Sequence, residues 1–276
     1  MLGHDKIIEV RDALSEKGIH DALEAEWLVT LALGKKRISE VYNLNLNKDD
    51  EIKINYILNQ RLQGKPLSYI IGNTEFYGRE FTINENVLIP RPETEILVEK
   101  VINDIKRLDK KVRILDLCTG SGIIGITLAL ETQSKVVCSD ISTGAIEVAK
   151  TNKNKLNANV EIIKSDLFTE IQGKFDIIVS NPPYIKSEDI LYLQSEVKNH
   201  EPHLALDGGD SGLEFYKKII KDAPKHLNPN GKLYFEIGIG QSNDIIKLMN
   251  KDFKNINVVK DYNKIDRVIT GNLRGD

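Results

Sequence analysis

The sequence predicts an α/β protein with a mostly parallel sheet covered by helices on both faces, preceded by a small helical bundle and a β-hairpin. Two observations predict this fold class. From residue 112 onward, short apolar runs alternate with helical stretches, which is the pattern of a parallel sheet with right-handed crossovers. Before that point the chain carries apolar side chains at helical spacing. A length of 276 residues suits one large domain or two unequal ones.

Composition narrows the class of protein further. The chain has 38 basic and 41 acidic residues, a net charge of −3, and 41% of its residues are hydrophobic. This apolar share can form a buried core, and the mild acidity argues against a basic nucleic-acid-binding surface. Two cysteines fit a reducing compartment better than a disulfide framework. Because no apolar segment resembles a signal peptide or a membrane span, we expect a soluble cytoplasmic protein.

Residues 1–71 are expected to form a helical bundle. Apolar side chains recur every three or four residues, and Gly18 and Gly34 stand where helices would stop. A later stripe ends at Gly64. We expect Trp27 in the core of this bundle. The stripes comprise Ile7, Val10 and Leu14; Ala22, Ala25, Trp27, Leu28 and Leu31; and Ile52, Tyr56, Ile57 and Leu62.

Residues 72–89 change character and predict a β-hairpin that links two domains. Polar and apolar side chains alternate along this stretch. Turn residues stand at Gly72 and Asn73, at Gly78 and again near Asn84. The hairpin therefore separates the helical domain from the rest of the chain.

The domain predicted for residues 90–276 begins with a helix and continues as alternating strands and helices. Pro92 suits the first turn of that helix, and Glu93 and Glu95 are favourable at its positive end. The last two strands are separated only by residues 261–264, so they must pair antiparallel. The expected strands are 112–116, 134–139, 160–164, 175–180, 231–237, 256–260 and 265–270, and the expected helices are 92–107, 122–131, 142–156, 212–226 and 241–251.

A glycine-rich loop follows the first of these strands. Gly120, Gly122 and Gly125 have the spacing of the dinucleotide-binding fingerprint, so an NAD enzyme must be considered. The strand, however, ends in Asp116, whose carboxylate would crowd a pyrophosphate and suits a cationic or zwitterionic ligand. The aminoacyl part of S-adenosylmethionine is such a ligand. We therefore favour a methyl donor over a dinucleotide.

Acidic residues end three successive strands of the predicted sheet. Ligands of open α/β sheets bind at the carboxyl ends of the strands, and Asp140 stands where such folds grip ribose hydroxyls. Asp166 is placed to accept from an adenine amino group, and Leu167 and Phe168 are expected to line the adenine. Each acid alone is equally well explained as a helix N-cap. Together with Asp116 they indicate a shared ligand.

The tetrapeptide Asn181-Pro182-Pro183-Tyr184 follows the fourth strand of this sheet. Its structural alternative is a rigid turn. The Asn181 side-chain oxygen and the Pro182 carbonyl can each accept one N–H of an amide, which leaves the nitrogen free to face a donor methyl. Two prolines fix φ and remove N–H groups, and Tyr184 offers a flat face to a planar group. We expect catalysis by positioning and preorganised electrostatics, without a metal or a covalent intermediate.

The whole chain resembles the PrmC/HemK family of bacterial peptide chain release factor methyltransferases. The resemblance implies a class I, Rossmann-like methyltransferase domain over residues 90–276 and a substrate-docking role for residues 1–71. The motifs that carry it are Gly72-Asn-Thr-Glu-Phe-Tyr-Gly, Ile89-Pro-Arg-Pro-Glu-Thr-Glu95, the 116–122 loop, Asp140, Asn181 to Tyr184, His200-Glu-Pro-His-Leu-Ala-Leu, and Phe235-Glu-Ile-Gly-Ile-Gly-Gln241.

This resemblance implies transfer of a methyl group from S-adenosylmethionine to the N5 amide nitrogen of a glutamine in a release factor. DNA amino-methyltransferases share the tetrapeptide. The run from Ile89 to Glu95 narrows the resemblance to enzymes that methylate glutamine. Cys118 departs from the glycine of the broad methyltransferase pattern. The implied catalytic residues are Asn181, Pro182, Pro183 and Tyr184, and the implied donor contacts are Cys118, Thr119, Gly120, Ser121, Gly122, Asp140, Leu167 and Asn181. The strand-end argument adds Asp166 to these donor contacts.

Three alternatives to a release factor methyltransferase stay open. A ribosomal-protein glutamine methyltransferase would use the same chemistry and differ only through the N-terminal domain. A DNA amino-methyltransferase would need a basic target-recognition domain, for which the charge balance and short connections leave no room, so we expect no DNA partner. A noncatalytic nucleotide-binding adaptor would have no evident need for the tetrapeptide. His200 and His203 lack further ligands at suitable spacing, so no metal site is expected.

Overall fold

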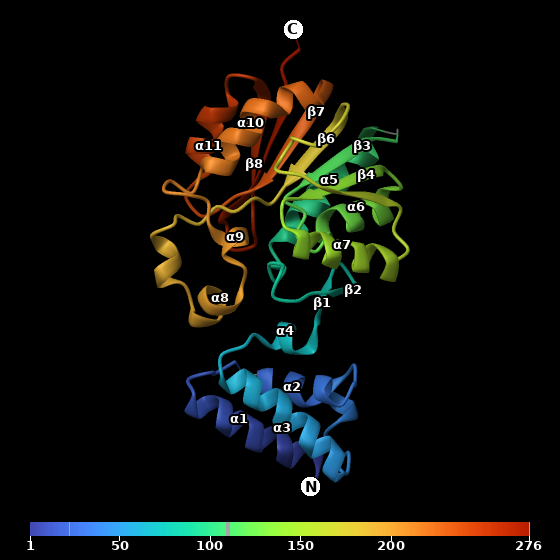
Figure 1. Cartoon of the computed structure of the whole chain (residues 1–276), viewed down its shortest axis with the longest axis vertical. Coiled ribbons are helices and arrows are strands. Elements are labelled where there is room, and N and C mark those ends of the chain that lie inside the picture. The colour runs from blue at the N-terminus through green and yellow to red at the C-terminus, as the bar shows by residue number, and fades with distance from the viewer. Residues whose placement is uncertain (22, 109–110, 276) are drawn as a thin grey trace. The chain divides into compact units, whose positions relative to one another are not determined.

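The protein, examined as a computed structural model, is described for residues 1–21, 23–108 and 111–275. It divides into two compact units, Met1–Gly72 and Asn73–Asp276, which are considered separately (Figure 1). Ala22, one member of the predicted apolar stripes, lies outside the described residues.

The first unit is helical, as its apolar spacing predicts. Gly18 and Gly34 follow the first two helices with φ of 77° and 64°, a left-handed conformation that glycine adopts without steric cost. Asn47 and Asp50 form a capping box at the start of the third helix. The elements are α1 (Gly3–Glu16), α2 (Glu24–Ala32), η1 (Ile38–Glu40), α3 (Lys48–Leu62) and α4 (Leu67–Ile71).

Aliphatic side chains from α1, α2 and α3 form the core of this unit. Val10 of α1, Leu28 of α2 and Ile54 of α3 are fully buried in it. Trp27, in contrast, is 39% exposed, so its predicted place in the core is wrong. Neighbouring helical residues point about 100° apart, and the inward direction at this turn belongs to Leu28.

A short antiparallel hairpin opens the second unit. It consists of β1 (Asn73–Phe76) and β2 (Arg79–Thr82), joined by Tyr77 and Gly78, whose positive φ values suit a two-residue hairpin turn. Asn152 of α7 (Thr143–Lys155) holds the end of β2, because its side chain accepts from the Thr82 N–H (2.7 Å) and donates to the Thr82 carbonyl (2.9 Å). The same Asn152 amide donates to the Ser121 carbonyl at 2.9 Å, which ties the hairpin to the glycine-rich loop.

The main sheet of the second unit has the order β5-β4-β3-β6-β7-β9-β8. In this sheet β9 runs in the direction opposite to all the other strands. This arrangement confirms the predicted fold class, including the antiparallel pair at the end of the chain. Its strands are β3 (Arg113–Leu117), β4 (Lys135–Asp140), β5 (Val160–Lys164), β6 (Phe175–Ser180), β7 (Leu227–Glu236), β8 (Phe253–Lys260) and β9 (Asp266–Leu273).

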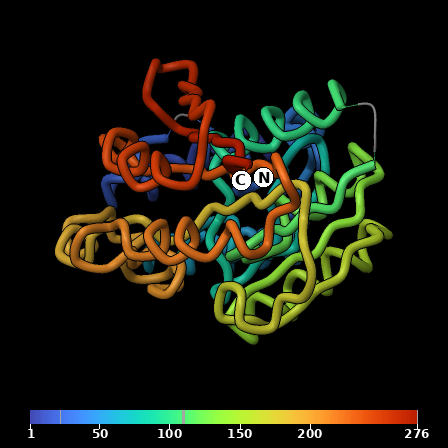
Figure 2. The backbone as a smooth tube through the Cα atoms, turned by 90° about the horizontal axis from the view of Figure 1, so that it is seen from above, coloured from blue at the N-terminus to red at the C-terminus, as the bar shows by residue number. Residues whose placement is uncertain are grey.

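Helices cover both faces of this sheet, and α5 and α10 lie on opposite sides of it in Figure 2. Alternate residues of one strand serve the two faces: Ile114 packs in the core beneath α5 and α6, whereas Leu115 packs in the core beneath α10 and α11. The helices are α5 (Thr94–Leu108), α6 (Ile123–Thr132), α7 (Thr143–Lys155), α10 (Glu214–His226) and α11 (Ser242–Met249).

The largest departure from the predicted elements lies between β6 and α10. Here the chain forms η2 (Asp189–Tyr192), α8 (Ser195–His200) and α9 (His203–Leu206), none of which the periodicity predicts. Each is too short to show a helical stripe of apolar residues. Strand ends also shift by a few residues, and β7 begins at Leu227 instead of residue 231.

Candidate active site

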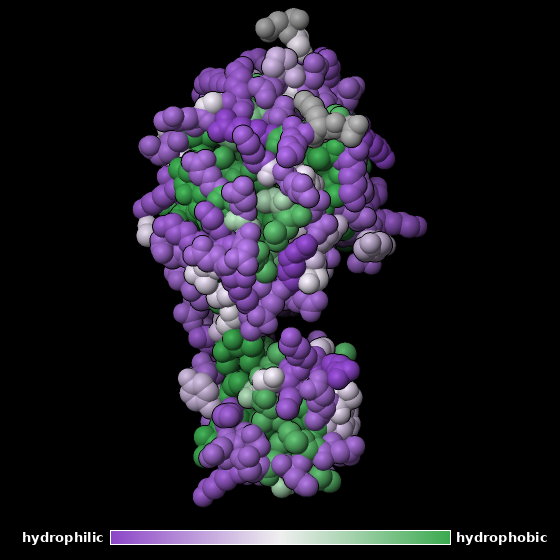
Figure 3. Space-filling model, turned by 90° about the vertical axis from the view of Figure 1, so that its right-hand side faces the viewer, coloured by the Kyte–Doolittle hydropathy of each residue, from purple (hydrophilic) through white to green (hydrophobic). Residues whose placement is uncertain are grey.

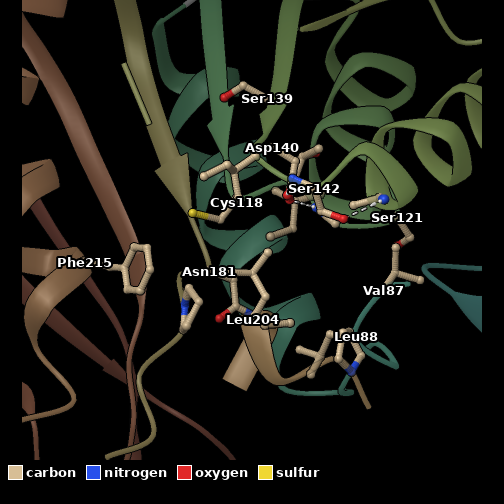
Figure 4. Close-up of a pocket in the computed structure, with 18 of the residues that line it drawn as sticks. Val87, Leu88, Cys118, Ser121, Ser139, Asp140, Ser142, Asn181, Leu204 and Phe215 are labelled. Atoms are coloured by element: carbon tan, nitrogen blue, oxygen red, sulfur yellow. Dashed lines mark hydrogen bonds between the residues drawn. The ribbon is translucent and has the colours of Figure 1, made fainter. Parts of the chain in front are cut away.

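A cavity of about 270 Å³ opens at the carboxyl ends of β3, β4, β5 and β6. Because these strands are parallel, the loops that follow them meet at one edge of the sheet. In Figure 4, Phe215 and Asn181 lie on one side of the cavity and Ser121 and Val87 on the other. The predicted site residues that line it are Cys118, Thr119, Gly120, Ser121, Asp140, Asp166, Leu167, Asn181 and Pro183.

Backbone hydrogen bonds shape the loop after β3. The Thr119 N–H donates to the Ser139 carbonyl (3.0 Å), and the Gly120 N–H donates to Oδ2 of Asp140 (2.9 Å). Cys118 and Gly120 both have left-handed φ, 59° and 55°. Because this conformation favours glycine, the cysteine at position 118 carries a conformational cost that the glycine of the broad methyltransferase pattern would not. A Cβ added at Gly120 would meet no atom of the described residues within 4 Å, so the loop leaves space beside its backbone.

Asp140 stands at the end of β4 with its carboxylate on the cavity wall (Figure 4). Its two oxygens accept from the backbone N–H groups of Gly120 and Ser142, each at 2.9 Å. Burial raises the pKa of this carboxyl above its usual range. Each oxygen retains a second lone pair, so the carboxylate can also accept from hydroxyl groups of a bound molecule.

The loop after β5 places Asp166 and Leu167 on the cavity wall but not Phe168. Leu167 has a φ of 47°, and its carbonyl accepts from the Ser165 hydroxyl at 2.8 Å. Phe168 turns into the core and stacks on the ring of His226, with 4.5 Å between centroids. The prediction that Phe168 lines an adenine site is therefore wrong.

Asp116 is fully buried and is absent from the cavity wall formed by the described residues. Its Oδ2 accepts from the Thr119 hydroxyl (2.5 Å) and from the Gly125 N–H (2.9 Å), which fastens the glycine-rich loop to the start of α6. Burial raises the pKa of Asp116 to about 7. The predicted direct contact with a ligand is wrong, and the argument that this carboxylate repels a pyrophosphate fails with it.

Gly122 and Gly125 are required by packing and do not line the cavity. A Cβ at Gly122 would lie 2.8 Å from the Ile126 side chain and 3.2 Å from that of Ala149. At Gly125 it would lie 2.3 Å from the Cys138 sulfur. The glycine spacing that matches the dinucleotide fingerprint is therefore explained by the close packing of α6 against its neighbours. The placement of Gly122 disagrees with its predicted donor contact.

The tetrapeptide forms the lip of the cavity after β6. Asn181 and Pro183 line it, whereas Pro182 and Tyr184 do not, and both prolines are buried. The Tyr184 carbonyl accepts from the Gln241 side chain at 2.9 Å, and burial raises the pKa of the Tyr184 hydroxyl to about 12. The Tyr184 ring was predicted to offer its flat face to a substrate. It packs against the core beneath α10, so that face is partly occupied.

Glu236, at the end of β7, is a buried acid beside this lip that the sequence patterns did not single out. It is 3% exposed, and its Oε2 accepts from the Thr94 hydroxyl at 2.7 Å. Asn181 follows the neighbouring strand β6, and its side chain lowers the pKa of this carboxyl. Burial raises the pKa of Glu236 to about 7. Its only signal in the sequence is its place in the segment from Phe235 to Gln241 that carries the family resemblance.

Segments far from the strand ends complete the cavity. The wall includes Leu88 from the loop after the hairpin, Leu204 from α9, and Phe215 and Lys218 from α10. Two of these segments are tied together by Glu201. Its carboxylate accepts from the Arg91 guanidinium at 2.6 Å and from the Ile89 N–H at 3.4 Å. Sequence reasoning gave these lining residues no role, although several lie within the segments of the resemblance. The further lining residues are Asn86, Val87, Pro90, Thr94, Ile123, Ile124, Ser139, Ile141, Ser142, Ala145, Ser165, Pro202 and Ala205.

The described parts of the chain contain neither a metal-binding cluster nor a membrane-spanning helix. Among these residues, no three His, Cys, Asp or Glu side chains come together as a group that could hold a metal ion. None of the helices described above is long and apolar enough to cross a membrane.

Comparison with known proteins defines the class of this protein. Residues 92–209 match the family described as "Methyltransferase small domain" and residues 6–72 match the "PrmC N-terminal domain". The fold is similar to that of a methyltransferase from Pyrococcus furiosus (TM-score 0.56, 21% identity, covering 78% of this chain and 96% of that one). It is also similar to the catalytic domain of hMettl16 (TM-score 0.59, 16% identity, 85% of each chain). The second unit is therefore a class I methyltransferase domain.

Relatives identify the family. The chain is 39% identical over 269 residues to the release factor glutamine methyltransferase of Geobacter sulfurreducens, covering 95% of this chain and 94% of that protein. It is 41% identical over 257 residues to the protein of the same name in Bacillus subtilis, covering 89% of each. At this identity over nearly the full length, the chain belongs to the release factor glutamine methyltransferase family.

Proposed function

We propose that this chain transfers a methyl group from S-adenosylmethionine to the side-chain amide N5 of a glutamine in a peptide chain release factor. One observation carries the proposal. The cavity that Asp140 and the glycine-rich loop line on one side is lined by Asn181 on the other. A donor held at the strand ends therefore shares one space with the group that can hold an amide. Family membership supplies the nature of the two substrates.

The cavity fits the methyl donor by its chemistry. Asp140 offers a carboxylate to ribose hydroxyls, and Asp166 offers one to an adenine amino group. Leu167, Ile141 and Ala145 add apolar wall for a flat ring. The space beside Gly120 admits a ligand close to the backbone. When bound, S-adenosylmethionine supplies an electrophilic methyl group on a sulfonium.

The tetrapeptide supplies the acceptor side of the reaction. The Asn181 side-chain oxygen and the Pro182 carbonyl each accept one N–H of the glutamine amide, which directs the nitrogen lone pair into the cavity. Pro183 keeps this segment rigid, because its ring fixes φ and removes a competing N–H. Tyr184 and Gln241 hold the segment in place through the hydrogen bond to the Tyr184 carbonyl. Catalysis by these residues is positioning and preorganised electrostatics.

The test is to offer the protein three acceptors together with labelled S-adenosylmethionine: a purified release factor, ribosomal proteins and DNA. We expect label on a single glutamine of the release factor, located by peptide mass spectrometry. Label on a ribosomal-protein glutamine would transfer the activity to the sister class of enzymes. Label on DNA would refute the proposal, since it would replace an amide acceptor by a base.

The first unit is proposed to dock the release factor. Ile52 and Tyr56 lie one turn apart on α3 with exposures of 59% and 67%, so they share one face of that helix. Figure 3 shows hydrophobic side chains at the surface of this unit. Neighbouring exposed apolar side chains are typical of protein interaction sites. We place the reaction in the cytoplasm, where free thiols such as those of Cys118 and Cys138 persist.

This docking role is tested with the double variant Ile52→Ala, Tyr56→Ala. We expect a higher KM for intact release factor and an unchanged KM for a short glutamine peptide, which needs only the cavity. Leu108→Ala is the matched control, because Leu108 is 50% exposed at the far end of α5 in the other unit. Equal loss of activity on the peptide and the intact protein would contradict the docking role.

A further inference from the structure

Glu236 and Asn181 occupy neighbouring positions at the ends of two parallel strands. Ser180 of β6 is in register with Phe235 of β7, so the next residue on each strand meets the other at the lip of the cavity. Glu236 is 3% exposed, whereas Asn181 reaches the cavity wall. A buried carboxylate at this point needs hydrogen-bond donors around it, because an unpaired buried charge is costly.

Two side chains meet that need. Thr94 donates its hydroxyl to Oε2 of Glu236 at 2.7 Å, and the Asn181 side chain, which follows the neighbouring strand, is a second group that lowers the pKa of this carboxyl, as a hydrogen-bond donor does. An ionised carboxylate only accepts hydrogen bonds, whereas an asparagine amide has a donating and an accepting end. An Asn181 amide that faces the ionised Glu236 therefore does so with its Nδ2. Its Oδ1 then points away from Glu236.

We propose that Glu236 is a positioning residue that fixes the orientation of the Asn181 amide. With Nδ2 held by the carboxylate, Oδ1 is left to accept an N–H from the substrate. The inference rests on the proposed function insofar as the acceptor is an amide or amino group. Glu236 itself does not touch the substrate, since it does not line the cavity formed by the described residues.

Ionisation of Glu236 is part of this arrangement. The charged and titratable groups around it come from four elements: Glu93 before α5, Arg267 on β9, Tyr184 after β6 and Tyr216 on α10. Burial outweighs the attraction of Arg267 and raises the pKa of Glu236 to about 7. A protonated carboxyl has an O–H that can donate to Oδ1 of Asn181 and reverse the amide. The rate should therefore fall as the pH drops through this pKa.

The direct test is Glu236→Gln, which keeps the shape of the side chain. A glutamine can donate as well as accept, so it no longer selects one orientation of Asn181. We expect kcat to fall on the order of 10-fold to 100-fold, with the Kd for S-adenosylmethionine unchanged. We also expect the acid limb of the kcat profile, present near neutral pH in the wild type, to disappear. Wild-type turnover with an intact acid limb would overturn the proposal.

Thr94 offers a second test that does not alter the carboxylate. Its hydrogen bond lowers the pKa of Glu236, so removing the hydroxyl with Thr94→Val should move the acid limb to higher pH. Thr94→Ser retains the hydroxyl and should leave the limb in place. If Glu236→Gln does not fold, this pair decides the question. Identical profiles for the Val and Ser variants would refute the role of the carboxylate.

The outcomes separate this inference from the proposed function. Methylation of another amide or amino acceptor by the wild type would end the proposed function. The Glu236→Gln comparison would then be made with that acceptor. Conversely, a release factor glutamine methylated equally well by wild type and Glu236→Gln would leave the function intact and remove the positioning role.

Discussion

The two sides of the cavity are built in different ways. On the donor side, backbone N–H groups of Gly120 and Ser142 hold Asp140, and the loop closes through the Thr119 N–H. On the acceptor side, the contact that we propose joins two side chains, Glu236 and the Asn181 amide. Under the proposed function, we therefore expect donor affinity to depend on loop geometry and turnover to depend on the orientation of one amide. Substitutions on the donor side should therefore change the Kd for S-adenosylmethionine, and substitutions on the acceptor side should change kcat.

A second contrast lies within the donor side, between Asp116 and Asp140. Asp140 is the last residue of β4 and Asp116 the next-to-last of β3, and both accept from a backbone N–H of a glycine. Asp140 faces the cavity, whereas Asp116 lies beneath the loop with no exposure. The loop after β3 folds back over the end of its own strand, so the same residue type stabilises the loop at one position and can hold a ligand at the other.

The largest expected effect is on the acceptor side. Asn181→Ala should lower kcat on the order of 100-fold to 1000-fold, since one preorganised partner of the reacting amide is lost. The Kd for S-adenosylmethionine, measured by calorimetry, should change little because Asp140 and the loop are untouched. Near-normal turnover in this variant would sink the amide-holding role. A parallel loss of donor binding would break the separation of the two sides.

Replacing each of the two donor-side aspartates by asparagine tests whether they play different roles. Asp140→Asn should raise the Kd for S-adenosylmethionine about 10-fold to 100-fold, because the asparagine NH2 opposes a backbone N–H and no longer accepts from a hydroxyl. Asp116→Asn should leave that Kd nearly unchanged, since Asp116 lies off the cavity wall. Equal effects of the two variants would show that burial does not distinguish these acids.

The stability of Asp116→Asn should respond to pH with a sign set by burial. The pKa of Asp116 is raised from 3.8 to about 7, so the folded state binds its proton more tightly than the unfolded state does. This group therefore stabilises the fold below pH 4 and loses that contribution as the pH rises to about 7. One pKa unit corresponds to about 1.4 kcal/mol.

Across this pH range the variant should gain stability relative to the wild type by more than about 1 kcal/mol, measured by urea unfolding at several pH values. The NH2 group would replace Oδ1, which lacks a hydrogen-bond partner in the described parts of the chain, so the two hydrogen bonds to Oδ2 are kept. Stability curves that stay parallel from pH 4 to 7 would mean that Asp116 is not the group that titrates.

The smallest expected effect concerns backbone conformation at Cys118. Its φ of 59° suits glycine, so Cys118→Gly should be more stable than Cys118→Ala by about 1 kcal/mol or less. Donor affinity should be similar in both, because the loop contacts through its backbone. Thermal unfolding of the two variants measures the difference. A clear advantage for the alanine variant would contradict a left-handed backbone at this position.

Local pattern predicts most of the fold and about a third of the residues that line the cavity. The strand ends and their following loops were placed to within a few residues, because period and turn residues are local properties. Leu88, Leu204, Phe215 and Glu236 were missed, since their approach to the cavity depends on packing between distant segments. Trp27 was misplaced for a related reason. Trp27 and Leu28 are both apolar and adjacent, and the sequence does not show which of the two points into the core.

By itself, the sequence determined the fold class, the loop after β3, and the acids and tetrapeptide at the strand ends. Alternation and spacing suffice for these, because parallel strands must bring their carboxyl ends to one edge. Only the tertiary structure decided which of these residues face the cavity. Asp116, Gly122 and Phe168 turn inward to satisfy burial and close packing, while Asp140 and Asn181 remain on the wall. Side-chain direction depends on what packs behind each residue, and residue spacing does not record it.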